Sequence, residues 1–482
     1  MHTRFFRITP LAVLLALTLS ACALPGRRPA GELTAAATFA VPDAWSEPAP
    51  RATPTPAPLA AWWRQFDDAP LEQLIGAALD DAPDVRSAQA KLRQARASRD
   101  LAVANLYPNL DLSSGATRSR SGTGSGNSQT LYNVGFDARW EPSIFGGLVD
   151  AADAARADAA AAQANLESTR ASLAAEVALE YVTLRLSQQR LAVVRANVDS
   201  QAETLRISEW REQAGLVTRL DVEQARANLE QSRATLPGLE VTRAGAEHRL
   251  SVLTGQAPGA LRGTLQEPRP LPSPPDGIAI GIPSDTLRQR PDVRAAELAL
   301  RAETARAAQS EADRYPSLTL SGSLGWKSLH LSTLDGGRSF VSSLAASLVA
   351  PVFDAGRIES RIAAQTAVRE QAFVAWEKSL LVALEDVENA LTAYANGRER
   401  LDARHKAAAA AANATELARA QYQAGLVDFQ RVLESERTLL NTQDSLVSAK
   451  ADVLTAVIQL YKALGGGWDN TGNVAPMEPS RS

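Results

Sequence analysis

The side chains that most often carry catalysis or bind metals are scarce in this chain of 482 residues. It has one cysteine, two methionines and four histidines, at positions 2, 248, 330 and 405. The histidines lack the spacing of metal ligands, and no phosphate-binding glycine loop or serine–histidine–aspartate arrangement stands out. Scarce methionine also disfavours a relay for soft metals. We therefore expect no enzyme activity, no metal site and no cofactor.

Cys22, the only cysteine, follows a targeting segment. Two arginines precede an apolar stretch over Leu11–Leu19, which is too short to span a membrane stably. Leu19-Ser20-Ala21-Cys22 is typical of a bacterial lipoprotein box, in which cleavage before the cysteine exposes a thiol that receives lipid. Acyl chains add roughly 0.8 kcal/mol of membrane affinity per buried CH₂, and Ala23 in place of aspartate favours the outer membrane. The alternative is a plain secretory signal with an incidental cysteine.

Four short motifs occur twice in the chain, with the second copy 208 to 210 positions after the first. The pairs are Gln-Ala-Gly-Leu-Val at 213–217 and 423–427, Pro-Asp-Val-Arg at 83–86 and 291–294, Tyr-Pro at 107–108 and 315–316, and Glu-Pro at 141–142 echoed by Ala-Pro at 350–351. Because order and offset are both kept, the chain is an internal duplication.

Each half contains one very long stretch with helical character. Leu148–Ala214 has no glycine or proline and can form a helix roughly 100 Å long at ~1.5 Å per residue. Its counterpart Arg357–Ala424 has no proline and a single glycine, Gly397. A turn at the glycine of each repeated pentapeptide would make two antiparallel hairpins. In the last helix, apolar residues recur every seven positions from Leu426 to Tyr461, which indicates coiled-coil packing. Pro237 should kink the fourth helix or end its first section.

The segments before each long helix alternate between apolar and polar residues. Gln129–Trp140 and Asn109–Arg118 alternate in the first half, and Leu318–Trp326 and Phe340–Leu348 in the second. This pattern suits membrane strands with lipid on one face and water on the other; the edge hairpin of a soluble sheet is the alternative. A membrane sheet must close, and known barrels need about eight or more strands. Four strands per chain therefore imply a shared barrel, with eight strands in a dimer or twelve in a trimer.

The duplicated arrangement resembles the TolC family of outer membrane factors. The paired Gly-Leu-Val turns and the segment 352–357 (Val-Phe-Asp-Ala-Gly-Arg) carry the resemblance, while Cys22, the segment 236–240 and the ending 460–468 look like its OprM/NodT-type lipoprotein branch. The resemblance implies a homotrimer with a twelve-strand barrel in the outer membrane and a twelve-helix periplasmic tunnel. The expected fold class is thus mainly α with a membrane β-barrel portion, from a protomer that duplicates two strands and a long helical hairpin.

The expected boundaries follow from the same motifs. They are a lipoprotein signal peptide over 1–21, a lipidated N-terminus and proline-rich arm over 22–70, a first efflux repeat over 71–255, a connector over 256–283, a second repeat over 284–465 and a C-terminal tail over 466–482. Within the repeats, strands are expected at 109–141 and 317–350, and helical hairpins at 147–254 and 356–464.

The resemblance also implies candidate gate residues. In the family, an acidic residue just past the second tip forms a ring across the closed aperture, and Glu434 matches it. Three such carboxylates on a threefold axis should influence cation passage, and Arg431 can pair with Glu434 at i,i+3. Some relatives have a second acid at the Arg431 position. Tyr422 and Asp221 match positions whose helix-to-helix contacts hold the channel of some family members shut. The alternative is that both are ordinary helix residues.

The repeated turns are the expected contacts for a periplasmic adaptor protein, and plain hairpin turns are the alternative. The residues concerned are Gly215, Leu216, Val217, Gly425, Leu426 and Val427.

Together these features predict the outer membrane channel of a tripartite, RND-type efflux system. It would be a passive conduit for small molecules such as drugs, working with an adaptor and an inner membrane pump. The alternatives are the channel of a type I protein secretion system and, less well supported, a periplasmic adaptor, which has one hairpin instead of two. A net charge of −4 without a basic block argues against nucleic acid as a partner. The expected location is the outer membrane of a Gram-negative bacterium, lipid-anchored and extending into the periplasm.

Overall fold

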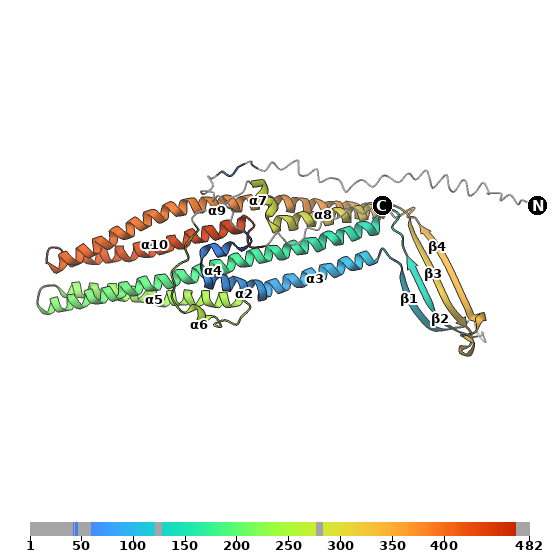
Figure 1. The fold of residues 1–482 in the computed structure, drawn as a ribbon, viewed down its shortest axis with the longest axis horizontal. Coiled ribbons are helices and arrows are strands. Elements are labelled where there is room, and N and C mark those ends of the chain that lie inside the picture. Colours follow the sequence, from blue (N-terminus) through green and yellow to red (C-terminus); the bar gives the residue numbers. More distant parts are fainter. Residues whose placement is uncertain (1–41, 43, 47–58, 121–127, 276–282, 469–482) are drawn as a thin grey trace, which may run out of the picture.

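A computed structural model describes residues 42, 44–46, 59–120, 128–275 and 283–468. The molecule is elongated, with long helices over most of its length and a sheet at one end (Figure 1). Its elements are the 3-10 helix η2 (Leu59–Phe66), α2 (Ala69–Asp81), α3 (Pro83–Ala104), β1 (Asn109–Arg120), β2 (Ser128–Trp140), α4 (Gly147–Gln213), α5 (Arg219–Leu253), α6 (Arg262–Leu265), α7 (Pro283–Gln289), α8 (Pro291–Ala312), β3 (Ser317–Ser328), the short 3-10 helices η3 (Leu331–Thr333) and η4 (Gly337–Ser339), β4 (Phe340–Val349), α9 (Arg357–Gln423) and α10 (Phe429–Ala463). Within the described ranges, no helix combines the length and apolar character needed to cross a membrane.

The two long helices, α4 and α9, each have 67 residues. Each turns back at its tip into a 35-residue partner, α5 or α10, so that two antiparallel hairpins reach the end of the molecule opposite the sheet (Figure 1). The helix α4 contacts both its own partner α5 and the second hairpin's α10. Two hairpins thus share one packed interface along α4.

Of the two effects expected of Pro237, a kink or an end of the first section, the end is absent, because α5 runs through this residue. Proline removes one backbone donor and crowds the carbonyl of the preceding turn. Pro237 lies on an exposed side of α5, where water can hydrate a freed carbonyl and the packing against α4 is undisturbed.

The heptad pattern of α10 agrees with the structure over most of its length. Leu433, Val447, Leu454 and Tyr461 are buried. The first member, Leu426, is instead exposed, because α10 begins only at Phe429 and Leu426 belongs to the preceding turn.

The sheet has the strand order β1-β2-β3-β4, and each neighbouring pair is antiparallel. Its register aligns the apolar residues of different strands on one face: Leu112 lies opposite Phe136, which lies opposite Leu324. The next row, with Asp137 opposite Ser323, lies on the other face and is polar. The predicted fold class, mainly helical with a two-faced sheet from both halves, is confirmed.

The main apolar core lies in the middle of the molecule, where the N- and C-terminal segments meet the hairpins. Trp62 is fully buried and stacks on Tyr461 with ring centroids 5.4 Å apart. Gly466 allows the segment just after α10 to approach η2 closely, since a Cβ there would lie 2.9 Å from the carbonyl oxygen of Leu59. These contacts fix η2 against the end of α10.

A second fixed point in this middle region is the buried Arg290, which joins α7, α8, α9 and the end of α10. Its guanidinium donates to Asp292 (2.7 Å), to Asp386 (2.9 Å) and to the carbonyl oxygen of Ala463 (3.1 Å). Burial alone raises the pKa of Asp292, but the hydrogen bond and charge of Arg290 outweigh it and hold that pKa below its usual value.

Candidate functional site

The two repeated turns have the same backbone hydrogen bonds. At the end of α4, the amide of Gly215 donates to Glu212 O and that of Leu216 to Arg211 O, both at 2.8 Å. The equivalent amides at the end of α9 donate to Tyr422 O and Gln421 O. This is the Schellman pattern, in which the glycine takes a positive φ: +73° at Gly215 and +75° at Gly425. The repeated pentapeptide therefore encodes a helix stop.

The helices that leave the two turns are capped differently. Thr218 and Asp221 form a capping box at the start of α5, in which the Asp221 carboxylate accepts from Thr218 N at 2.9 Å. At the start of α10, Asp428 accepts from the amide of Arg431 at 3.0 Å. Arg431 thus occupies in the second hairpin the position of Asp221 in the first, and the two tips differ in charge there.

Apolar side chains are exposed at both tips. Leu216 is 68% exposed and Leu426 is 75% exposed, whereas Val217 and Val427 turn inward against a small apolar cluster that includes Phe429. Exposed leucines at the end of a long hairpin are a candidate contact surface for another protein.

Arg431 and Glu434 form an ion pair on the exposed side of α10. Arg431 Nη1 lies 3.2 Å from Glu434 Oε2, and both side chains are 67% exposed. An ion pair this exposed contributes only about 0–1 kcal/mol. The predicted i,i+3 pair is therefore present and is easily broken.

Tyr422 is buried and held by the first hairpin. The Arg211 guanidinium lies 4.4 Å from the centre of its ring, and Arg211 Nη1 donates to Tyr422 O at 2.9 Å. The phenol oxygen has no hydrogen-bond partner in the described part of the chain. The structure therefore pairs Tyr422 with Arg211 and not with Asp221.

A carboxylate that the sequence did not single out lies buried close to Tyr422. Glu436 is 1% exposed, and its Oε1 accepts from Arg419 Nη2 (3.0 Å), Arg419 Nε (3.2 Å) and Thr204 Oγ1 (2.8 Å). These three residues come from α10, α9 and α4, so a single carboxylate joins both hairpins.

Polar contacts continue along the boundary between α4 and α10. Arg190 makes two bonds to Asp444, at 2.5 and 2.8 Å, and Asn197 Nδ2 donates to Gln443 at 2.9 Å. We call this row, together with the Thr204–Glu436 contact, the polar seam. It separates the apolar core in the middle of the molecule from the small apolar cluster at the tips.

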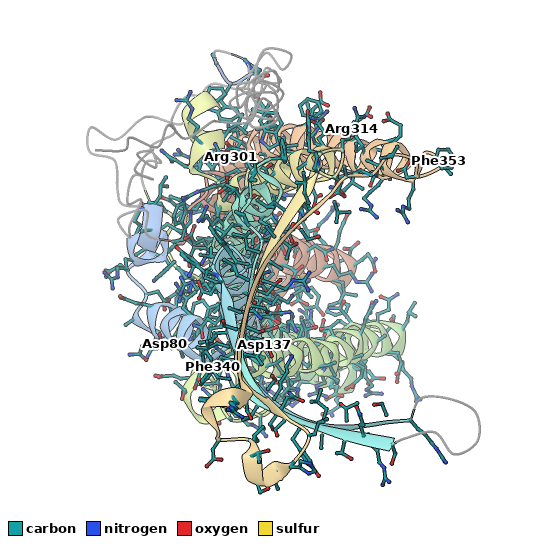
Figure 2. The ribbon with its side chains drawn as sticks, turned by 90° about the vertical axis from the view of Figure 1, so that its right-hand side faces the viewer. Asp80, Asp137, Arg301, Arg314, Phe340 and Phe353 are labelled. Carbon is teal, nitrogen blue, oxygen red and sulfur yellow. The ribbon has the colours of Figure 1, made fainter. Side chains whose placement is uncertain are left out.

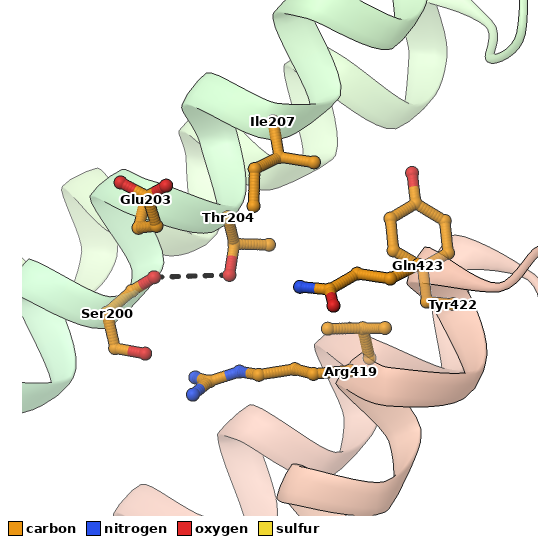
Figure 3. Close-up of a pocket in the computed structure, with 8 residues that line it drawn as sticks. Ser200, Glu203, Thr204, Ile207, Arg419, Tyr422 and Gln423 are labelled. Carbon is orange, nitrogen blue, oxygen red and sulfur yellow. Dashed lines mark hydrogen bonds between the residues drawn. The ribbon is translucent and has the colours of Figure 1, made fainter.

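A cavity of about 100 Å³ is lined by Thr204 and Arg419, the two residues that donate to Glu436 (Figure 3). Thr204 and Ser200 line it from α4, and Arg419, Tyr422 and Gln423 from α9. Ile207 and Val432 also line it, so the cavity has both polar and apolar walls. The hairpins therefore leave a gap between α4 and α9 at this level.

Glu436 does leave a signal in the sequence. One column running along α10, at intervals of seven residues, contains Phe429, Glu436, Gln443, Lys450, Val457 and Leu464, so three polar residues occupy a column that is apolar at both ends. The sequence signal for Arg211 is weaker, because it is only that of a basic residue in the last turn of a helix.

Two further predictions concern the lipoprotein signal and metal binding. Cys22 and the signal segment 1–21 lie outside the described residues. Among the residues that are described, no group of three or more histidine, cysteine, aspartate or glutamate side chains is placed to hold a metal ion.

A sheet with one apolar face, set at the end of two long helical hairpins, defines a channel protein of the outer-membrane type. The family described as "Outer membrane efflux protein" matches residues 74–256 and 282–466. The chain belongs to this family, and it is the outer-membrane channel component of an efflux system.

Individual relatives agree. The chain is 32% identical over 419 residues to the pyoverdine export outer membrane protein OpmQ of Pseudomonas aeruginosa, covering 85% of this chain and 88% of the relative. It is 29% identical over 480 residues to nodulation protein T of Rhizobium leguminosarum bv. viciae, covering 100% and 97%. The solved structure of the outer-membrane channel OprN superposes with a TM-score of 0.84 at 31% identity, over 89% of this chain and 98% of that one. The predicted OprM/NodT-type relationship and the outer-membrane location are confirmed.

Proposed function

We propose that this chain forms a homotrimeric, passive conduit that works with a periplasmic adaptor and an inner membrane pump to export small molecules. The observation that carries the proposal is the open sheet: β1 and β4 are its two unpaired edges, and one face is apolar. Lipid cannot satisfy the backbone groups of an open edge, so the sheet must close with other copies. Three copies provide twelve strands and the lumen that an efflux channel needs.

The hairpin tips are the proposed adaptor contact. Leu216 and Leu426 are exposed and apolar, and the Schellman turns hold them in a fixed geometry. Three copies present six such tips. A partner with apolar positions at its own hairpin ends would bury these leucines.

Glu434 is the proposed gate residue, with Arg431 as its local counter-charge. The pair is exposed and weak, so cations that pass a ring of three such pairs compete with Arg431 for the carboxylate. Tyr422 and Asp221 act differently in this proposal: the first fixes α9 to Arg211, and the second caps α5.

A lipid on Cys22 anchors the N-terminus in the membrane. The support is the Leu19-Ser20-Ala21-Cys22 motif and the absence of another cysteine. Cys22→Ser should abolish labelling by a fatty-acid probe, and retained label on the variant would overturn the anchor.

The assembly is tested by isolating the full chain from outer-membrane fractions in mild detergent. A trimeric mass that falls to the monomer on heating supports the conduit, and a stable monomer overturns it. Glu434→Gln in the same preparation should reduce cation selectivity in planar bilayers, with Glu416→Gln on the neighbouring helix as the matched control. Equal selectivity in both variants would remove Glu434 from the gate.

A further inference from the structure

The two ends of the sheet have different surroundings in the outer membrane. The helical hairpins extend into the periplasm, so the end of the sheet next to the helices faces the periplasm and the far end faces the outside of the cell (Figure 1). β1 ends at Arg120 and β2 begins at Ser128, and both residues lie at the far end. Figure 2 shows Phe340, the first residue of β4, beside the segment with η3 and η4. We call this far end the outer end of the sheet.

The apolar face of the sheet begins with a tryptophan at the helix end. Trp140 lies in the row of Leu320, and its indole Nε1 donates to Leu106 O at 2.9 Å, where α3 leads into β1. The rows that follow toward the outer end are mostly aliphatic. Their large apolar members are Leu110, Leu112, Phe136, Leu324 and Leu344. This face therefore has a continuous band of hydrocarbon that starts at Trp140.

Aromatic side chains end this band on its outer side. Trp326 lies opposite Phe340, with ring centroids 5.9 Å apart, and Tyr132 belongs to the next row. Trp326 is 38% exposed and Phe340 is 49% exposed. Tryptophan and tyrosine in membrane strands favour the level at which hydrocarbon meets the lipid headgroups. The aromatic rows therefore mark the outer interface of the membrane.

Two arginines lie immediately beyond the aromatic rows on the same face. Arg118 and Arg120 occupy alternate positions of β1 with Leu112, opposite Thr130 and Ser128. Arg118 Nη2 lies 3.4 Å from the hydroxyl of Ser128, and no carboxylate of the described residues pairs with Arg118. A cation without a carboxylate partner is available to an anion from outside the chain.

The distance between Trp140 and these arginines matches the thickness of a membrane. Thr130, which lies opposite Arg118, is ten residues from Trp140 along β2, or about 34 Å at the rise of an extended strand. Membrane strands tilt by roughly 40°, so the height is about 26 Å, close to the ~25 Å apolar band of outer-membrane sheets. With Trp140 at the periplasmic interface, Arg118 lies at the level of the headgroups of the outer leaflet.

The outer end of the sheet is basic, although the chain as a whole is acidic. Residues 113–136 contain two arginines and no acidic residue, and residues 324–342 contain Lys327, Arg338 and one acid, Asp335. The net charge of these two stretches is +3 with histidine neutral, against −4 for the whole chain. The partner of this surface should therefore carry negative charge.

We propose that Arg118 and Arg120 bind phosphate groups of lipopolysaccharide, the phosphorylated glycolipid of the outer leaflet, while its acyl chains contact the apolar face. This inference goes beyond the proposed conduit but rests on its closed sheet, whose apolar face contacts lipid. A guanidinium presents a planar fork of donors that binds phosphate through two hydrogen bonds. Lipid A, the membrane part of lipopolysaccharide, has phosphates on its disaccharide and so supplies both the anion and the hydrocarbon that this face accommodates.

Native mass spectrometry of the full-length assembly in mild detergent measures this contact. Bisphosphorylated lipid A is titrated, and the fraction of assemblies that carry it gives an apparent Kd. One basic residue near an anionic membrane surface changes binding by about 5-fold, so Arg118→Gln combined with Arg120→Gln should weaken it by roughly 30-fold. Lys327→Gln is the matched control, because Lys327 lies at the same end of the sheet but on the polar face of β3. Its apparent Kd should stay close to that of the parent.

Lipid A without its phosphates separates the two parts of the contact. The parent should bind it no more tightly than the double variant binds the bisphosphorylated form. Equal binding of both lipids by the parent would overturn the phosphate contact, because the apolar face alone would then retain the lipid. Equal affinity of parent and double variant, or an equal loss in Lys327→Gln, would also overturn it.

The same spectra distinguish a failure of this inference from a failure of the proposed conduit. Parent trimers that retain no lipid A would refute the glycolipid contact and leave the conduit intact. A stable monomer would refute the assembly, and the lipid contact with it.

Discussion

The buried ion pair between Arg419 and Glu436 should stabilise the distal part of the hairpins far more than the exposed pair between Arg431 and Glu434. Arg419→Gln removes the charge and both bonds to Glu436 Oε1, which then keeps only Thr204. Breaking a fully buried ion pair costs about 3–5 kcal/mol. The Arg419 side chain is 35% exposed and lines a partly open cavity, so the expected cost falls to about 2 kcal/mol, or roughly 30-fold in the opening equilibrium.

Native-state hydrogen exchange on the intact assembly measures this effect locally. Amide protection between residues 432 and 440 should fall by roughly 30-fold in Arg419→Gln, because local opening there becomes easier. Arg431→Gln is the matched control, since it breaks a pair of the same chemistry on the same helix. Its expected change is less than about 5-fold. Equal protection in the two variants would refute the argument that burial decides the value of these pairs.

The remaining predictions concern the turns and the middle of the molecule. Gly425→Ala should lower stability by about 1 kcal/mol through its positive φ alone, since nothing lies within 4 Å of an added Cβ; Gly238→Ala, helical and equally open, should raise the melting temperature instead. Asp292→Asn should cost about 1 kcal/mol or less at pH 7, because the carboxylate is 42% exposed. The lowered pKa of Asp292 means that this contribution is present above its unfolded pKa of about 3.8 and is lost as pH falls below it, so melting curves of variant and parent should converge in acid. Trp62→Ala should cost about 3–5 kcal/mol in urea unfolding, and a smaller loss would show that the core around Tyr461 is less tightly packed than its burial indicates.

The architecture could be predicted from the sequence because its signals are local and repeated. Alternation in Gln129–Trp140 predicted the two faces of a strand, and the glycine of each pentapeptide predicted a helix stop. The offset of the motifs linked the two halves without any tertiary information. The sequence left open whether Pro237 ends or only kinks the helix, because the effect depends on which side of the helix a proline occupies, and periodicity within α5 is too weak to show that side.

The contacts between hairpins were harder to predict because their partners are distant in the chain. Arg211 binds the end of α9 across 211 positions, and no local pattern connects these residues. Glu434 was found through its place after the repeated turn. Glu436, two residues later, was missed although it is the buried one, because the side of α10 that faces α4 becomes clear only when all four helices are in place.

The polar seam has a thermodynamic consequence. Where apolar helices separate, newly exposed hydrocarbon raises the heat capacity, and the free energy of separation then curves strongly with temperature. Along the seam, separation of α4 from α10 would expose amides, hydroxyls and charges such as Asn197, Thr204 and Glu436, and polar exposure lowers the heat capacity. The heat-capacity change for separating α4 from α10 along the seam should therefore be small, and the equilibrium constant for that separation should follow a nearly straight van't Hoff line over the growth range of the cell.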